Sequence, residues 1–252
     1  NENKMGYMAL LRNLNNFIKY KVSEDKVITQ ITNEELVKKS KQLPFRFYTA
    51  YKNVVGNRRY SDAISIAMDI AVGNAPKLEG KTLIAVDSSG SMSGDPVEKA
   101  AIFAATLLKA NITSDVILYD TKVKEFTSTS RAPVVDIADR IIKETMGGGT
   151  ETSLVFKYAF TKQIKYDRFI IISDNESWSE GSGGVQEIYN EYKKQTQTDP
   201  FVYAIDIQGY GSKDIVNPKV FHLTGWSDRL LDFISQAEKG QSLVQYIKSI
   251  EL

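Results

Sequence analysis

Four apolar runs of strand length, separated by segments with helical periodicity, constrain the fold of this chain more than any other feature of its sequence. They lie at residues 82–87, 114–120, 168–174 and 200–207 and read TLIAVD, SDVILYD, RFIIISD and PFVYAIDI. Continuous apolar runs that alternate with helices are typical of parallel strands buried on both faces of a sheet. The sequence therefore predicts an α/β domain with a doubly wound, mostly parallel, Rossmann-like sheet.

Two weaker runs are expected at the edges of this sheet. VKEF, residues 123–126, follows the second strand too closely for a helical crossover, so we expect an antiparallel hairpin there. VFHLTGW, residues 220–226, is expected to be a weak last strand. One helix between the strands is expected to take Asp95 as its N-cap, because Pro96 suits the first helical position. SLVQYIKSIEL, residues 242–252, is expected to be a C-terminal helix.

Residues 1–75 have helical periodicity. MGYMALLRNLNNFIKY, residues 5–20, places its apolar side chains at the i, i+3, i+4, i+7 spacing of one helix face and predicts a single helix. Further short helices follow, so we predict the C-terminal helices of a helical-repeat module at 1–75, a linker at 76–81 and the α/β domain at 82–252. Because the chain begins with Asn1 rather than Met, the true N-terminus is expected upstream.

The composition excludes several kinds of site. Without cysteine there are no disulfides, thiolate metal ligands or cysteine nucleophiles, and the single His222 excludes a multi-histidine metal site. No apolar run approaches the roughly 20 residues that span a bilayer, so we expect no membrane partner. The absence of cysteine fits a reducing compartment, and a cytoplasmic location is expected. Residues 1–80 carry 13 Lys and Arg against 8 Asp and Glu, whereas residues 81–252 carry 19 against 23, which suggests two parts with different partners.

Five oxygen-bearing side chains lie where predicted strands give way to loops. Asp87, Ser89 and Ser91 end or follow the first strand, Thr150 follows a triple glycine, and Asp174 ends RFIIISD. The carboxyl ends of parallel strands meet at the edge of the sheet where α/β domains bind ligands. Oxygen ligands suit Mg²⁺ or another divalent cation such as Mn²⁺ or Ca²⁺. Two carboxylates leave such an ion under-neutralised, so it should attract an external carboxylate or phosphate oxygen.

The same five residues resemble a known metal site. Asp87-x-Ser89-x-Ser91, with Thr150 and Asp174 in separate loops, is similar to the metal-ion-dependent adhesion site (MIDAS) of von Willebrand factor A domains. The resemblance implies that the two serines and the threonine bind the cation directly, and that the two aspartates act partly through water.

A second resemblance covers the whole chain. ALLRNLNNF near the start, LPFRFYTAY, GGGTETSL and SDNESW are similar to segments of the Ro 60 kDa family. Proteins of that family carry a ring of helical repeats, the TROVE module, followed by an A domain, and they bind small structured non-coding RNAs. The resemblance implies a non-catalytic RNA-binding protein in which residues 1–75 are the last helices of the ring.

Further residues are assigned to these two expected functions. Asn175 and Glu176, directly after Asp174, are predicted to orient the metal ligands, although they would serve equally well as ordinary loop residues. Lysine and arginine supply the sequence-independent part of RNA affinity, and a solvated helical face is the alternative reading of such residues. The predicted phosphate contacts are Lys4, Arg12, Lys19, Lys38, Lys39, Lys41, Arg46, Arg58 and Arg59.

Two alternatives remain open from the residues alone. The metal could grip a carboxylate of a protein partner, in an adhesion or scaffold module that does not bind RNA. A metal-assisted hydrolase would need a base near the ion, and no convincing one is present. The segment GSMSG at 90–94 has the outline of a nucleophile elbow, but Met92 occupies the central position, so it does not predict a serine hydrolase.

Overall fold

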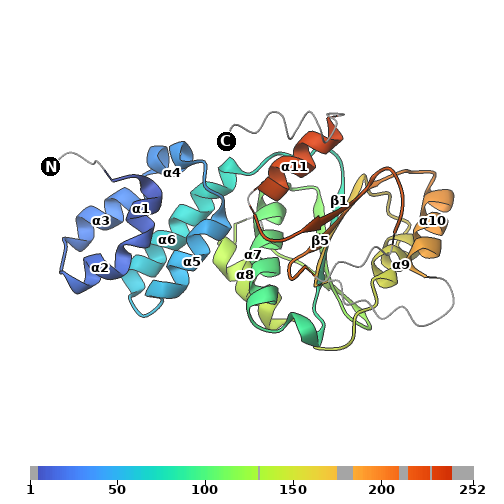
Figure 1. The fold of residues 1–252 in the computed structure, drawn as a ribbon, viewed down its shortest axis with the longest axis horizontal. Coiled ribbons are helices and arrows are strands. Elements are labelled where there is room, and N and C mark those ends of the chain that lie inside the picture. Colours follow the sequence, from blue (N-terminus) through green and yellow to red (C-terminus); the bar gives the residue numbers. More distant parts are fainter. Residues whose placement is uncertain (1–4, 130, 175–183, 210–214, 228, 240–252) are drawn as a thin grey trace.

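The computed structural model describes residues 5–129, 131–174, 184–209, 215–227 and 229–239. A helical N-terminal segment lies beside an α/β domain (Figure 1). The predicted helix at 242–252 lies outside the described residues. No helix in the described part of the chain is long and apolar enough to cross a membrane.

The α/β domain is built on a mostly parallel sheet, which confirms the predicted fold class. Within the described residues the sheet has six strands in the order β3-β2-β1-β4-β5-β6. The predicted hairpin strand is the antiparallel edge strand, and the other neighbouring pairs are parallel. The strands are β1 (Thr82–Asp87), β2 (Ser114–Tyr119), β3 (Val123–Phe126), β4 (Arg168–Ser173), β5 (Phe201–Asp206) and β6 (Val220–Thr224).

The order of the strands places a topological switch point at the carboxyl ends of β1 and β4. The chain builds outward from β1 through β2 to β3, then crosses back and builds outward on the other side through β4, β5 and β6. In doubly wound sheets the loops diverge at such a switch point and leave room for a ligand. Val86 pairs with Ile172 at the end of this central contact, so the loops that follow β1 and β4 start side by side.

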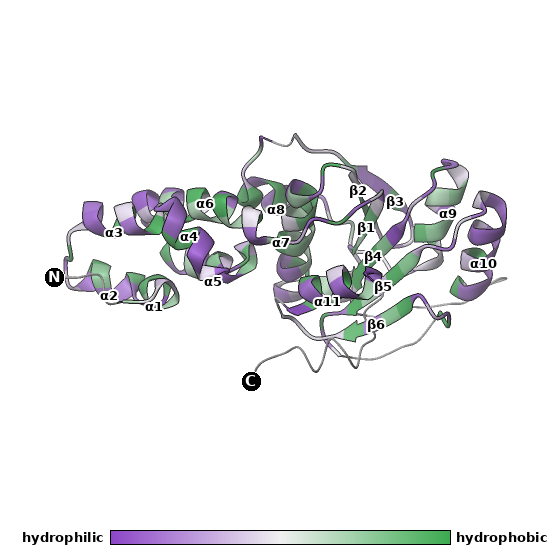
Figure 2. Cartoon of the chain, turned by 90° about the horizontal axis from the view of Figure 1, so that it is seen from above, coloured by the Kyte–Doolittle hydropathy of each residue, from purple (hydrophilic) through white to green (hydrophobic). Residues whose placement is uncertain are grey.

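Helices cover both faces of the sheet. α7 (Asp95–Ala110), α8 (Val134–Lys143) and α11 (Arg229–Glu238) lie on one face, and α9 (Ser153–Thr161) and α10 (Val185–Thr196) lie on the other (Figures 1 and 2). The buried side chains of β1 divide accordingly. Ile84 and Val86 pack in the core with the first group of helices, whereas Leu83 and Ala85 pack with the second. Because both faces are buried, the strand sequences are continuously apolar rather than alternating.

Two local details differ from the expectations. α7 begins at Asp95 itself, with Gly94 at the N-cap position and φ of 84° there. The Asp95 carboxylate instead pairs with Lys99 Nζ at 2.6 Å, one helical turn further on. α11 was not predicted, although Leu230, Leu231 and Ile234 have the spacing of a buried helix face.

Short helices make up the N-terminal segment. The run at 5–20 is divided at Asn13 rather than forming one helix, so that prediction was wrong. Asn33 and Asn57 cap two of the helices, accepting the amides of Leu36 and Tyr60. The helices are α1 (Tyr7–Arg12), α2 (Leu14–Lys19), α3 (Glu24–Ile31), α4 (Glu34–Ser40), α5 (Pro44–Val54) and α6 (Arg58–Ala71), followed by the 3₁₀ turn η1 (Val72–Asn74).

The helical segment packs against the α/β domain through α5 and α6, which contact α7 and α8. Trp226 lies between two phenylalanines of the two parts, 5.2 Å from Phe45 and 5.4 Å from Phe103 between ring centroids. Asp69 of α6 accepts the Val134 amide at 2.9 Å and Lys109 Nζ at 2.8 Å. One hydrophobic core therefore continues from the helical segment into the sheet.

The predicted linker at 76–81 lies against the α/β domain. Leu78 is buried, and its amide donates to Asn111 Oδ1 at 2.7 Å. Lys77 Nζ donates to the carbonyl of Ala110 at 2.7 Å. These bonds attach the segment between the two parts to the C-terminal end of α7.

Candidate functional site

The two predicted aspartates lie at the ends of the neighbouring parallel strands β1 and β4. Asp87 ends β1 and Asp174 follows β4, and both are fully buried. Ser173, the last residue of β4, donates its hydroxyl to Asp87 Oδ2 at 2.6 Å. The adjacent parallel strands thus bring together two carboxylates that are 87 positions apart in the sequence.

The loop after β1 presents the two predicted serines. The Ser89 amide donates to Asp87 Oδ1 at 2.8 Å, so the aspartate fixes the turn of its own loop. The hydroxyls of Ser89 and Ser91 are 3.1 Å apart, and Ser91 is exposed while Ser89 is buried. Met92 is buried below them at the end of a 3₁₀ turn, η2 (Gly90–Met92). The two serine hydroxyls therefore lie close together.

The loop with the triple glycine is hydrogen-bonded to the loop that follows β1. The Gly147 amide donates to the carbonyl of Ser88 at 2.8 Å, and the Gly90 amide donates to the carbonyl of Gly148 at 2.9 Å. Thr150 follows and is buried. The main chains of the two loops are thus bonded to each other, and Thr150 lies two positions after one of these bonds.

Without a cation, ionising both Asp87 and Asp174 is unfavourable, because Asp87 is buried and the two carboxylates repel each other. Burial raises the pKa of Asp87 above its ordinary value, and the negative charge of Asp174 adds to the rise. Hydrogen bonds from Ser173 and Ser89 act in the opposite direction without cancelling it. A divalent cation would relieve the repulsion between the two carboxylates, and the donor set contains only oxygen, which Mg²⁺ prefers. The residues present therefore fit such an ion.

The donor set is poor in carboxylates. In the described ranges no three His, Cys, Asp or Glu side chains gather as a metal-binding group. The candidate cluster has two aspartates and three hydroxyls, so an ion held there would keep much of its charge. Asn175 and Glu176, predicted to orient the ligands, lie outside the described residues.

Two residues at this edge were not predicted. Ser173 donates to Asp87, and Asp120, directly after β2, accepts amides of two loops. A signal for Asp120 was present, because SDVILYD ends in aspartate as TLIAVD and RFIIISD do. Ser173 had no such signal, since a serine one position before Asp174 has no pattern of its own.

The predicted RNA-contacting cations differ in their surroundings. Three of them are in ion pairs: Lys38 with Glu34, Arg58 with Asp62 at 3.7 Å, and Arg59 with Glu24 and Asp25 at 2.6 Å each. Arg46 is exposed on α5 and has an interaction of its own. Lys4 lies outside the described residues. Of the predicted contacts, the exposed cations with no ion pair among the described residues are Arg12, Lys19, Lys39 and Lys41.

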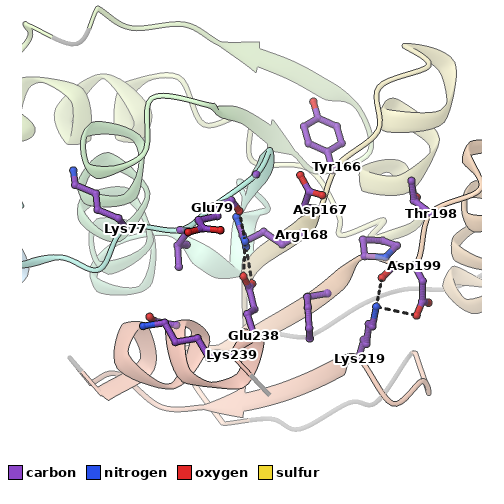
Figure 3. A pocket seen from close by; sticks show the side chains of 15 residues that line it. Lys77, Glu79, Tyr166, Asp167, Arg168, Thr198, Asp199, Lys219, Glu238 and Lys239 are labelled. Carbon is purple, nitrogen blue, oxygen red and sulfur yellow. Dashed lines mark hydrogen bonds and ion pairs between the residues drawn. The ribbon is translucent and has the colours of Figure 1, made fainter. Parts of the chain in front are cut away.

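A separate pocket of about 640 Å³ lies at the opposite edge of the sheet, where the strands begin (Figure 3). Its wall contains a buried ion pair in which Arg168 Nε donates to Glu238 Oε1 at 2.6 Å. Lys219 pairs with Asp199 at 3.2 Å on the other side. The acidic and basic groups of this pocket largely neutralise one another, so it offers no strongly charged site.

Comparison with known proteins identifies the family. Residues 81–236 match the Ro60 vWA domain. The chain belongs to the Ro60 vWA family. Residues 1–57 match the TROVE domain, in the order that the sequence predicted.

Two relatives extend this comparison. The chain is 22% identical over 239 residues to "RNA-binding protein RO60" of Caenorhabditis elegans, covering 86% of this chain and 37% of that protein. The crystal structure of the Deinococcus radiodurans RO (RSR) protein has the same fold, with a TM-score of 0.76 and 17% identity, over 93% of this chain and 53% of that one. The chain therefore spans between about a third and about half of the length of these relatives.

Proposed function

We propose that this chain is part of a non-catalytic protein that binds small structured RNA and holds a divalent cation, Mg²⁺ by preference, on its A domain. The observation that carries the RNA proposal is the succession of a TROVE match and a Ro60 vWA match in one chain. The name of the nematode relative, an RNA-binding protein, supports it. Because the sequence contains no cysteine, the proposal includes a reducing, cytoplasmic location.

The proposed RNA contacts are exposed cations of the helical segment. Arg12 and Lys19 lie at the ends of α1 and α2, and Lys39 and Lys41 lie at the end of α4. A cation that already pairs with a carboxylate must give up that partner to bind a phosphate. The four without an ion pair among the described residues are therefore the stronger candidates, ahead of Lys38, Arg58 and Arg59.

A salt series tests the RNA proposal. Binding of a fluorescein-labelled RNA hairpin is measured by anisotropy between low and moderate salt, for the wild-type chain and for a variant with Gln at all four positions. Each lost phosphate contact lowers the slope of log affinity against log salt by about 0.7–0.9. The control variant has Gln at four ion-paired lysines of the A domain: Lys99, Lys124, Lys162 and Lys193.

The expected result is a slope about 3 units shallower for the helical variant and a nearly unchanged slope for the control. Equal losses in both variants would mean that the attraction is a general charge effect and not a surface of the helical segment. Absence of binding by the wild-type chain at low salt would contradict the RNA contacts proposed here.

The proposed cation ligands are the hydroxyls of Ser89, Ser91 and Thr150, with Asp87 and Asp174 holding the ion directly or through water. When bound, the ion would supply an open coordination position for an anionic oxygen. The residues of this chain set the position: Ser173 and the Ser89 amide hold the Asp87 carboxylate, and the bonded loops bring the hydroxyls together. An RNA phosphate or a carboxylate of a protein partner has the chemistry to fill that position.

Binding of Mn²⁺, followed by the electron paramagnetic resonance (EPR) signal of the free ion, tests the metal proposal. We expect one saturable site in the wild-type protein and its loss in Asp87→Asn, because the variant removes half of the carboxylate charge of the cluster. Asp199→Asn is the matched control, since Asp199 lies at the opposite edge of the sheet. Lack of saturable binding by the wild type at millimolar Mn²⁺, or equal binding by both variants, would refute this site.

A further inference from the structure

A third buried aspartate, Asp120, lies at the same edge as the candidate metal site and is not one of its proposed ligands. It follows β2 directly and is only 3% exposed. Its Oδ1 accepts the Lys122 amide at 2.8 Å, which fixes the turn between β2 and β3. Burying a carboxylate is costly unless its oxygens are hydrogen-bonded or paired with a charge. The partner of the second oxygen, Oδ2, therefore shows what Asp120 binds besides its own turn.

The second oxygen of Asp120 binds the loop that carries Thr150. Oδ2 accepts the amide of Gly148 at 2.9 Å. The main-chain carbonyl of Asp120 accepts the amide of Glu151 at 3.0 Å. These two bonds attach the threonine loop to the end of β2 on either side of Thr150. The loop is bonded on its other side to Ser88 and Gly90, so Asp120 supplies the opposing anchor.

The fit between Asp120 and this loop requires glycine at one position. A Cβ on Gly148 would lie 2.5 Å from Asp120 Oδ2, closer than such atoms approach one another. A Cβ on Gly149 would meet its nearest neighbour, Thr121 Cγ2, at 3.8 Å, which is an ordinary contact. Neither glycine has a positive φ, in contrast to Gly147 at +80°. Glycine is therefore required at position 148, the middle of the three, because Asp120 leaves no room for a Cβ there.

We propose that Asp120 is a positioning residue for the metal site: it acts through the Gly148 amide to hold Thr150 where its hydroxyl can reach the cation. This inference rests on the proposed metal function. Asp120 itself is directed at backbone amides rather than at the cluster, so it differs in role from Asp87 and Asp174. Residues that orient metal ligands in this way typically change metal affinity by about 10–100-fold when they are replaced.

The negative charge of Asp120 provides a competing explanation, because any nearby carboxylate attracts a cation. Two variants separate charge from position. Asp120→Asn removes the charge and the bond to Gly148, while its remaining carbonyl oxygen can still accept the Lys122 amide. Gly148→Ala keeps the charge and forces the loop away from Asp120. A positioning role predicts that both variants weaken binding, whereas a charge effect predicts that only the first does.

Each variant has a matched control at the same edge. Gly149→Ala adds the same methyl group one position further on, without a close contact. Asp206→Asn removes a buried carboxylate at the end of β5, where Oδ1 accepts the amides of Gln208 and Gly209 in its own loop. It therefore removes a charge from the same edge of the sheet and leaves the threonine loop bonded.

Affinity for Mn²⁺ is measured by EPR on the full chain, at a temperature where circular dichroism shows every variant to be folded. We expect Asp120→Asn and Gly148→Ala to weaken binding by about 10–100-fold, and both controls to stay within about threefold of the wild type. A second readout is amide exchange without metal, which should become faster at Gly148 and Glu151 in Asp120→Asn. A role in stability alone would lower the melting temperature and leave the affinity of the folded protein unchanged.

The outcomes distinguish this inference from the proposed function. Saturable Mn²⁺ binding by the wild type with unchanged affinity in Asp120→Asn overturns the role of Asp120 and leaves the metal site intact. Weak binding in Asp120→Asn with wild-type affinity in Gly148→Ala assigns the effect to charge and also overturns it. Absence of binding by the wild type refutes the metal site itself, and with it any role of Asp120 toward a cation.

Discussion

Replacement of Glu238 by glutamine tests the buried ion pair at the edge of the sheet opposite the candidate metal site. The Arg168 side chain is 3% exposed and that of Glu238 is 15% exposed. The guanidinium binds both carboxylate oxygens, and it also donates to Thr82 Oγ1 at 2.8 Å and to the carbonyl of Glu79 at 2.5 Å. Arg168 therefore joins α11, β1 and the segment before β1 (Figure 3).

The size of the expected loss in unfolding free energy follows from leaving one charge buried without its partner. Glu238→Gln keeps the size of the side chain but leaves the guanidinium without its counter-charge, which costs about 3–5 kcal/mol. Arg168→Met leaves the carboxylate instead, and the cost should be near the lower end of that range because Glu238 is partly exposed. In the double variant Arg168→Met/Glu238→Gln neither charge remains. Its cost should be about 1–3 kcal/mol, from the lost bonds to Thr82 and Glu79.

Urea unfolding followed by circular dichroism, with linear extrapolation to water, measures these differences. Asp199→Asn is the control, because it breaks an ion pair whose side chains are 40% and 53% exposed and should cost less than about 1 kcal/mol. A loss of stability in Glu238→Gln no larger than in this control would contradict the cost of a buried unpaired charge. Additive effects of the two single substitutions in the double variant would also contradict it, since the coupling between Arg168 and Glu238 is then absent.

Three further substitutions test other features of the fold. Gly80→Ala should destabilise the protein by about 1–3 kcal/mol in urea unfolding, because φ is +80° and the added Cβ would lie 2.3 Å from Asp167 Oδ2. Asp69→Ala should cost about 1–2 kcal/mol, since it removes the acceptor of the Val134 amide at the start of α8; an unchanged unfolding midpoint would contradict this. Burial and neighbouring carboxylates raise the pKa of Asp139 above 3.8, so ionising it costs native stability. Asp139→Asn should match the wild type below about pH 4 and become the more stable of the two as pH rises through that raised pKa. The difference in unfolding free energy should be less than about 1 kcal/mol at this partly buried position.

The strands of the sheet could be predicted from local sequence, because a strand buried on both faces is a continuous apolar run. TLIAVD and RFIIISD have no alternation, and both are buried along their whole length. The hairpin at VKEF followed from loop length alone, since few residues separate it from β2. Local signals failed where packing decides the outcome. The apolar spacing at 5–20 continues across Asn13, yet the chain turns there. α1 contacts α3 and α4 as well as α5, whereas α2 packs mainly on α5.

Charged residues illustrate the same limit. The sequence places Arg59 among the candidate RNA contacts, but its guanidinium binds Glu24 and Asp25, which lie more than 30 positions away. Helix spacing can identify a pair such as Lys38 with Glu34, one turn apart. It cannot identify a pair formed between two helices, because that depends on how the helices pack.

Thr150 of the candidate metal site lies in the loop between α8 and α9, so its place did not follow from a strand end. For Asp87 and Asp174, the sequence by itself determined the donor type, the strand-end position and the shared edge. These features follow from strand length and from the rule that parallel strands end together. Only the tertiary structure decided that Ser173 binds Asp87 and that Asp120 approaches Gly148. Those contacts join loops that are distant in sequence, and they depend on strand order and register. Apolar periodicity reports burial within one element, whereas hydrogen bonds between loops report how the elements are arranged.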